Sequence, residues 1–152
     1  MRYNEPSQGW TGKVPAGWTS VVIGPEFVRG DPLRDPTRLL LRTYRNRVPA
    51  AALRELANDD GITATSLKGE RSAEKLDWQR YRGSEAGKPK LAAEVALAED
   101  GADTQVAALV GRRSELARLV QTALLPALDS FVPGPPDPSR SVLATVPRAP
   151  SY

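Results

Sequence analysis

The chain has 152 residues, of which 40% are hydrophobic and 26% charged, and this is an ordinary composition for a globular protein. It contains no cysteine and no histidine, which excludes disulfides, thiolate metal sites and catalysis by a thiol or an imidazole. The net charge is only +3, so the composition does not predict a strongly basic nucleic-acid-binding protein.

Two further features bear on the compartment. No apolar run approaches the roughly 20 residues that a membrane-spanning helix needs. The first ten residues are polar and lack the basic and then apolar pattern of a signal peptide. We therefore expect either a cytoplasmic protein or an extracytoplasmic one whose signal segment has been removed.

The N-terminal quarter of the chain is rich in glycine and proline and contains short segments with strand character. Residues 10–14 form one such segment, and residues 19–23, with several β-branched side chains, form another. Between them, the Pro-Ala-Gly sequence at 15–17 predicts a tight turn, because proline presets one backbone angle and glycine accepts a positive φ. Residues 39–44 predict the next strand, with alternate side chains on opposite faces.

A helix is predicted from Pro49 onward. Proline suits the first turn of a helix because its missing N–H has no helical partner there, and the alanine-rich residues that follow favour a helix. Leu53, Leu56 and Ala57 form an apolar stripe. The Asn-Asp-Asp-Gly sequence at 58–61 is expected to end the helix.

The middle of the chain predicts four strands that follow one another in hairpin-like pairs. Residues 62–68 have the least regular pattern, whereas 76–82 and 90–98 alternate clearly. The acidic segment 99–103 contains an Asp-Gly pair that is typical of a hairpin turn. Residues 104–110 are apolar on both faces, which indicates a central strand.

The last predicted helix has Ser114 as its N-cap and Glu115 in its first turn. Apolar residues recur at helical spacing from Leu116 to Phe131. Pro126 is expected to bend this helix, because its ring displaces a backbone hydrogen bond.

The C-terminal segment differs from the rest, since six of the residues 133–152 are proline. This composition predicts an extended tail rather than a packed element, although residues 141–146 have strand character. We expect the tail to dock on its own domain or on a neighbouring chain, and dimerisation through it is a further prediction.

The order of the elements predicts the fold class. Because the strands come in hairpin-like pairs, the sheet should be mostly antiparallel. The prediction is an α+β fold, a mostly antiparallel sheet flanked by two helices, in a single domain at residues 1–132. The order differs from the regular strand–helix alternation of a doubly wound nucleotide-binding fold.

Short motifs in the chain resemble a known superfamily. They are the Val-Pro-Ala-Gly-Trp turn at 14–18, the Trp-x-x-Tyr sequence at 78–81, the strand pair at 90–98 and 104–110, and the helix that ends near Phe131. Over residues 10–132 this pattern resembles the PsbP-like α/β/α sandwich superfamily, which includes PsbP, a Ran-GTPase-binding nuclear transport factor, LpqN-type lipoproteins and DcrB-type chaperones. The latter half is also similar to accessory domains of bacterial α/β-hydrolase polypeptides. The resemblance implies a protein that acts by binding, and it carries over no catalytic or ligand residue.

Aromatic and basic side chains supply the candidate binding residues. The aromatic ones either pack in the core or form the apolar wall of a groove between the sheet and a helix. The basic ones come from the arginine-rich stretch 29–47 and either contact an acidic partner or phosphate, or form a solvated strand edge. The candidates are Trp10, Trp18, Trp78, Tyr81, Arg38, Arg42 and Arg45.

Two weaker patterns were weighed for metal binding or catalysis. The acidic segments at 59–60 and 99–103 do not have the ligand spacing of a calcium loop. Ser72 and Lys75 form a Ser-x-x-Lys sequence, but the partner motifs that accompany it in penicillin-recognising enzymes are absent. No cofactor and no metal site is predicted.

Three hypotheses for function remain open. The preferred one is a non-catalytic accessory module that binds a protein partner or a small apolar ligand. The first alternative is a domain or fragment of a bacterial serine hydrolase, or another enzyme that uses carboxylate or Ser-Lys chemistry. The lesser alternative is binding of phosphate or nucleic acid through the arginines.

Overall fold

The computed structural model describes residues 1–5, 8–22 and 26–134. The predictions for the proline-rich tail concern its docking, its strand character at 141–146 and dimerisation through it. They lie outside the described residues, apart from Pro133 and Gly134.

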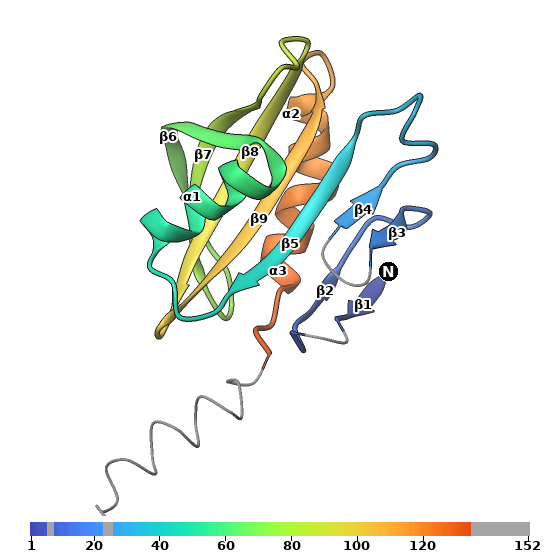
Figure 1. Cartoon of the computed structure of the whole chain (residues 1–152). Helices are drawn as coiled ribbons and strands as arrows, with labels where there is room; N and C mark the ends of the chain where they lie inside the picture. Colours follow the sequence, from blue (N-terminus) through green and yellow to red (C-terminus); the bar gives the residue numbers. More distant parts are fainter. Residues whose placement is uncertain (6–7, 23–25, 135–152) are drawn as a thin grey trace, which may run out of the picture.

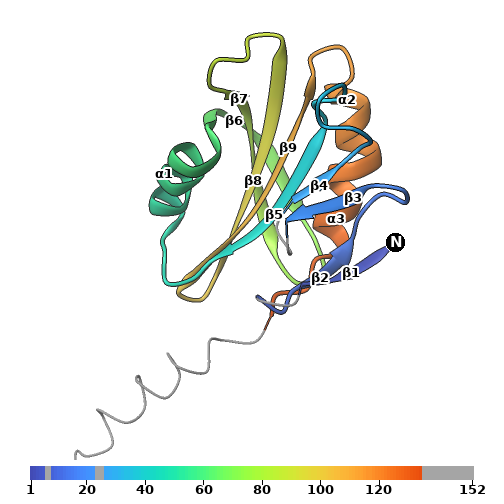
Figure 2. The same ribbon diagram turned by 45° about the vertical axis from the view of Figure 1, so that its right-hand side comes forward.

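The described strands form one seven-stranded antiparallel sheet with helices on both of its faces, so that the molecule has three layers (Figures 1 and 2). A separate two-stranded ribbon pairs β1 (Arg2–Asn4) with β2 (Thr11–Lys13). In spatial order, the sheet consists of β3 (Thr19–Val22), β4 (Glu26–Val28), β5 (Arg38–Tyr44), β9 (Asp103–Arg112), β8 (Leu91–Asp100), β7 (Asp77–Glu85) and β6 (Ile62–Ser72). This arrangement confirms the predicted α+β class and the antiparallel sheet.

The sheet separates two apolar cores, and strand alternation assigns side chains to them. Leu39 and Leu41 of β5 face the core under the C-terminal helix, whereas Leu40 and Tyr44 face the core under the first helix. β9 lies at the centre of the sheet and all but its last residue are buried, which confirms the prediction made from its two apolar faces.

The first helix, α1 (Pro49–Asp60), begins and ends as its sequence predicts. Pro49 occupies the first turn, and Gly61 ends the helix with a φ of 69°, donating its N–H to the carbonyl of Ala57. Ala52 and Leu56 are buried against the sheet. α1 contacts β6, β8 and β9 and leaves part of the same sheet face uncovered.

The C-terminal helix is one continuous rod with three parts, α2 (Leu116–Leu119), a π-helical turn η1 (Val120–Leu124) and α3 (Leu125–Ser130). A bend at Pro126 was predicted; what precedes Pro126 is this π turn, in which Leu125 donates its N–H to the carbonyl of Val120. Pro126 has no N–H for the next helical bond, and the wider turn that precedes it accommodates the loss.

The predicted N-cap of this helix is wrong. Ser114 lies in a turn outside the helix, Glu115 occupies the N-cap position, and no side chain caps the first turn. The Glu115 carboxylate instead accepts hydrogen bonds from Arg29 and Arg112. A tertiary ion pair has therefore replaced the local cap that the sequence favours.

Three strands differ from the sequence prediction. β1 and β4 were not predicted, and each has only three residues. β6 extends to Ser72 rather than ending near 68, and its register shifts twice along β7, between Ala64 and Ser66 and again between Leu67 and Gly69. These bulges break the alternation on which the sequence prediction depends.

Candidate functional site

A cavity of about 650 Å³ lies on the α1 face of the sheet, beside α1 rather than beneath it. Pro49 at the start of α1 borders one side, and the turn that joins β6 to β7 borders the other. We call this cavity the acidic groove. Its lining residues are Pro49, Ala73, Glu74, Lys75, Leu76, Asp77, Gln79, Tyr81, Leu97 and Glu99.

Strand alternation builds the floor of the acidic groove. Trp78 of β7 faces the core under the C-terminal helix. Because side chains alternate along a strand, Gln79 and Tyr81 lie on the opposite face of the sheet, the one that α1 partly covers. Leu97 of β8 lies directly opposite Gln79 and extends the floor. The result is an aromatic and aliphatic base from two neighbouring strands.

The rim of the acidic groove carries carboxylates that the fold leaves unused. Among the described residues, four carboxylates make neither an ion pair nor a hydrogen bond, and three of them line this one cavity. These four are Asp59, Glu74, Asp77 and Glu99, of which Asp59 alone lies elsewhere. Lys75 is the single cation in the lining, so the groove has an excess of negative charge.

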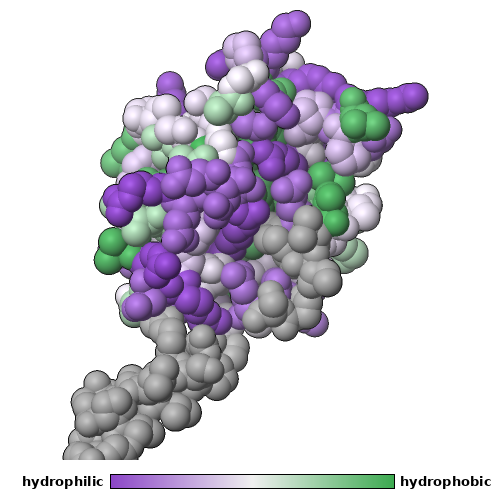
Figure 3. All heavy atoms as spheres, viewed as in Figure 1, coloured by the Kyte–Doolittle hydropathy of each residue, from purple (hydrophilic) through white to green (hydrophobic). Residues whose placement is uncertain are grey.

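The α1 face as a whole is polar. Hydrophilic side chains cover most of it, and hydrophobic ones appear in small, separate groups (Figure 3). The exposed large hydrophobic residues are likewise scattered over the chain rather than gathered in one patch, and they are Met1, Val21, Leu33, Val48 and Leu67. A broad apolar docking surface is therefore not the feature that distinguishes this face.

The structure distributes the four predicted aromatic residues among three places. Tyr81 lines the acidic groove, and Trp18 lines a smaller cavity of about 380 Å³ beside α2. Trp10 and Trp78 are 0% and 1% exposed and pack on Phe131, with ring centroids 5.3 and 5.6 Å from it. Core packing thus accounts for Trp10 and Trp78, and only Tyr81 and Trp18 reach a cavity.

The three arginines that were candidate binding residues all pair with carboxylates of the same chain. Two lie in β5 and the third directly follows it. Arg38 pairs with Glu26 and Glu85 at 3.2 and 2.8 Å. Despite the burial of Glu85, which raises its pKa, the hydrogen bond and charge of Arg38, helped by Lys88, hold that pKa below its usual value.

Arg42 and Arg45 are satisfied in the same way. Arg42 makes a two-pronged ion pair with Asp60 at the end of α1, and Arg45 pairs with Asp103 at 3.1 Å. Burial raises the pKa of the Tyr44 hydroxyl, and this effect is larger than the lowering by the hydrogen bond and charge of Arg42, so the pKa lies above its usual value. These arginines tie elements of the fold together and do not converge on an open surface.

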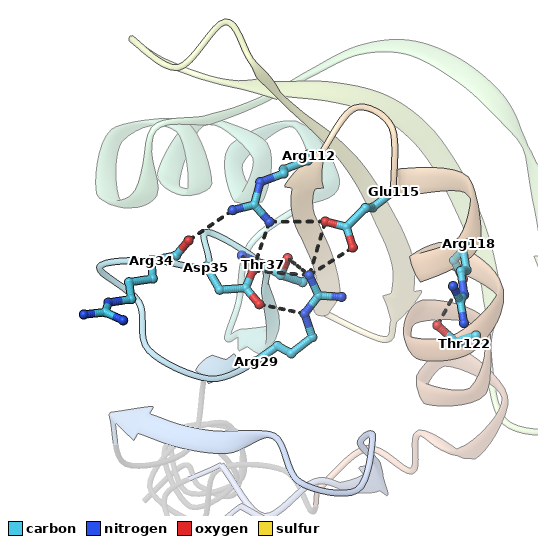
Figure 4. Close-up of polar contacts among 8 residues, drawn as sticks. All are labelled: Arg29, Arg34, Asp35, Thr37, Arg112, Glu115, Arg118 and Thr122. Carbon is cyan, nitrogen blue, oxygen red and sulfur yellow. Dashed lines mark hydrogen bonds and ion pairs between the residues drawn. The ribbon is translucent and has the colours of Figure 1, made fainter.

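A second group of arginines surrounds the start of α2 (Figure 4). Arg29 of the β4–β5 loop donates to Asp35 at 2.7 Å, to Thr37 at 3.1 Å and to Glu115 at 3.1 Å. Arg112 joins the same network through Glu115 and the carbonyl of Arg34. We call Arg29, Asp35, Thr37, Arg112 and Glu115 the arginine cluster.

The charges of the arginine cluster balance, because two arginines face two carboxylates. The hydrogen bond from Arg29 is the main reason that the pKa of Asp35 falls to about 2. Arg118, on the next turn of the helix, is exposed and makes no ion pair within the described part of the chain. The cluster therefore joins the β4–β5 loop to the helix and offers little free charge to a ligand.

The residues considered for catalysis do not form a catalytic arrangement. Ser72 is exposed at the end of β6 and lines none of the cavities described here, whereas Lys75 lies in the following turn. No three acidic side chains of the described residues lie close enough to hold a metal ion. None of the helices in the described segments is long and apolar enough to cross a membrane.

The comparisons with known proteins agree with this architecture. No protein-family model matches the sequence, and a comparison with curated proteins finds no significant match. Among solved structures, the chain is similar to LpqN, involved in cell envelope biogenesis of Mycobacterium tuberculosis. The TM-score is 0.53 and the identity 16%, with 89% of this chain and 90% of that one covered.

A second solved structure, cyanobacterial PsbP (CyanoP) from Synechocystis sp. PCC 6803, matches equally well. Its TM-score is 0.53 at 13% identity, over 88% of this chain and 91% of that one. The chain therefore has a PsbP-like fold, as the turn at 14–18 and the later motifs predicted.

Sequence reasoning missed most of the acidic groove. Of its lining residues only Tyr81 was a candidate, and Glu74, Asp77 and Glu99 were not. The available signal was the alternation of 76–82, which places Asp77, Gln79 and Tyr81 on one face. What the alternation did not show was that α1 stops short of this part of the face.

Proposed function

We propose that this protein is a non-catalytic accessory module that binds a protein partner through the acidic groove. The observation that carries the proposal is the gathering of three unpaired carboxylates around a floor of Tyr81 and Leu97. In a chain whose other described carboxylates nearly all have partners, charges left open at one cavity are available to a ligand.

The chemistry of the groove favours a particular kind of partner. An extended segment with a lysine or arginine side chain can place its cation among the carboxylates and over the aromatic ring. A backbone lying along the floor would meet Leu97. The PsbP-like fold, and the similarity to a protein involved in cell envelope biogenesis, support an accessory role of this kind.

The proposal is tested by NMR titration of the 152-residue chain carrying Arg140→Glu and Arg148→Glu, which removes the basic residues of its own tail. We expect tetra-arginine to shift the resonances of Tyr81, Leu97 and Glu99 with millimolar or tighter affinity, and tetra-glutamate to leave them unchanged. Adding Asp77→Lys and Glu99→Lys should weaken tetra-arginine binding at least tenfold, because each substitution reverses a charge at the rim.

The matched control places lysine at Asp59, which is unpaired but outside the groove, and it should bind as before. Shifts spread evenly over the surface, or no loss of affinity in the double lysine variant, would contradict the proposal. The arginine-dependent alternative receives no comparable support, since Arg38, Arg42 and Arg45 are all paired within the chain.

A further inference from the structure

The acidic groove has a neighbour that lies at the root of the C-terminal tail. A second cavity of about 480 Å³ is lined by Phe131 and Val132 on one side and by Glu74 and Lys75 on the other. Glu74 and Lys75 line the acidic groove as well. The two cavities therefore share two residues of the β6–β7 turn.

The chain is firmly held up to the point where it leaves this second cavity. Phe131 packs between Trp10 and Trp78, and Val132 exchanges two backbone hydrogen bonds with Thr11, at 2.8 and 3.0 Å. In Figure 1 the end of α3 and the ribbon of β1 and β2 lie at the same end of the molecule. Val132, three residues before the tail, lines the same cavity as Glu74 and Lys75 of the β6–β7 turn.

We propose that the proline-rich tail, residues 135–152, docks back into the acidic groove of its own chain. The inference rests on the same groove as the proposed function and adds that the chain carries its own competing ligand. A tail bound in this way would have to be displaced before a partner could enter.

Length and charge both fit this occupant. Arg140 is six residues beyond Gly134, which makes a tether of up to about 19 Å in the extended conformation that prolines favour. Arg140 and Arg148 outnumber the single acidic side chain after Gly134, Asp137, and Glu74, Asp77 and Glu99 likewise outnumber Lys75 in the groove, so the two excess charges are opposite in sign.

The composition of the tail fits the floor as well. Pro135, Pro136 and Pro138 precede Arg140, and proline-rich segments characteristically lie against aromatic side chains such as Tyr81. Because the tail is tethered beside the groove, its effective concentration there is in the millimolar range. Weak contacts are therefore sufficient for docking within one chain, whereas a second copy would have to bind more tightly.

The absence of cysteine makes a direct test available. In the 152-residue chain, Gln79→Cys in the groove and Ser141→Cys beside Arg140 supply the only two thiols. A disulfide requires the two Cβ atoms to approach to about 4 Å. Under mild oxidation of a dilute sample, we expect this pair to form an intramolecular disulfide at least ten times faster than a control pair, Gln121→Cys with Ser141→Cys. Gln121 is exposed on the C-terminal helix, on the other face of the sheet.

Charge dependence provides the second measurement. Adding Asp77→Lys and Glu99→Lys should slow cross-linking of the groove pair at least threefold, while the Gln121 pair should keep its rate. Equal rates for the two pairs, or disulfides that join two chains at low protein concentration, would overturn the proposal. Tetra-arginine binding to the Arg140→Glu, Arg148→Glu chain is a separate readout, so a failed cross-link with intact peptide binding rejects the docked tail and leaves the proposed function standing.

Discussion

The arginine cluster and the acidic groove use the same kinds of side chain for opposite purposes. In the cluster, Asp35 and Glu115 are bound by Arg29 and Arg112, and the network joins a loop to a helix. In the groove, Asp77 and Glu99 make neither an ion pair nor a hydrogen bond within the part of the chain that the structure describes. The difference teaches that the charged residues of this chain divide into a stabilising set and an available set, and that position in the sequence does not distinguish them.

The largest expected effect on stability is in the cluster. Arg29→Ala should lower the free energy of unfolding by about 2 kcal/mol, because it leaves a partly buried carboxylate pair without its main donor. Arg118→Ala, in the same region but without an ion pair, should change it by less than about 0.5 kcal/mol. Urea denaturation of the two variants measures both values. If the two variants lost a similar free energy of unfolding, the ion pairs of Arg29 would not be the source of its contribution to stability.

Acid sensitivity sharpens the comparison further. The folded pKa of Asp35 is about 2, below its ordinary value of 3.8. The stabilisation from its ionised form is therefore fully present above about pH 4 and is lost as the pH falls toward 2. Asp35→Asn should lower the thermal stability at pH 7. It should also reduce the loss of thermal stability between pH 4 and pH 2, and thermal unfolding measures both effects. If the variant lost as much thermal stability between pH 4 and pH 2 as the unmodified chain, the assigned role of Arg29 would be contradicted.

The smallest effect on stability is expected in the groove. Asp77→Ala and Glu99→Ala should each change the free energy of unfolding by less than about 0.5 kcal/mol, since neither carboxylate has a partner to lose. The sign should tend toward stabilisation, because each change reduces repulsion among neighbouring carboxylates. Thermal unfolding at low and high salt tests this, and a loss above 1 kcal/mol would show a structural contact in the groove.

Much of the fold could be predicted from the sequence because local patterns are strong in the centre of the sheet. Alternation along 90–98, apolar residues on both faces of 104–110, and the Asp-Gly turn between them together specify a hairpin. Proline at the start and glycine at the end mark α1 for reasons that are also local. Where tertiary contacts compete with local preference, as at Ser114 and Glu115, the sequence prediction was wrong.

The candidate site was less predictable than the fold. Tyr81, Trp10 and Trp78 were all candidates either for core packing or for the wall of a groove; Tyr81 lines the acidic groove, whereas Trp10 and Trp78 are in the core. Burial of a tryptophan depends on which elements cover its face of the sheet. That coverage is set by how far α1 and the C-terminal helix extend over the sheet, which no local pattern records.

The sequence by itself determined the limits of the chemistry: without cysteine or histidine, this chain must work through carboxylates, amines, hydroxyls and contact surfaces. It also determined the α+β class, since strand alternation and helix-end residues act over a few positions. Only the tertiary structure decided which charges are free. Arg38 and Glu85 are 47 positions apart and pair across the sheet, whereas Asp77 and Glu99 come together in the groove unpaired, because ion pairing depends on proximity in space.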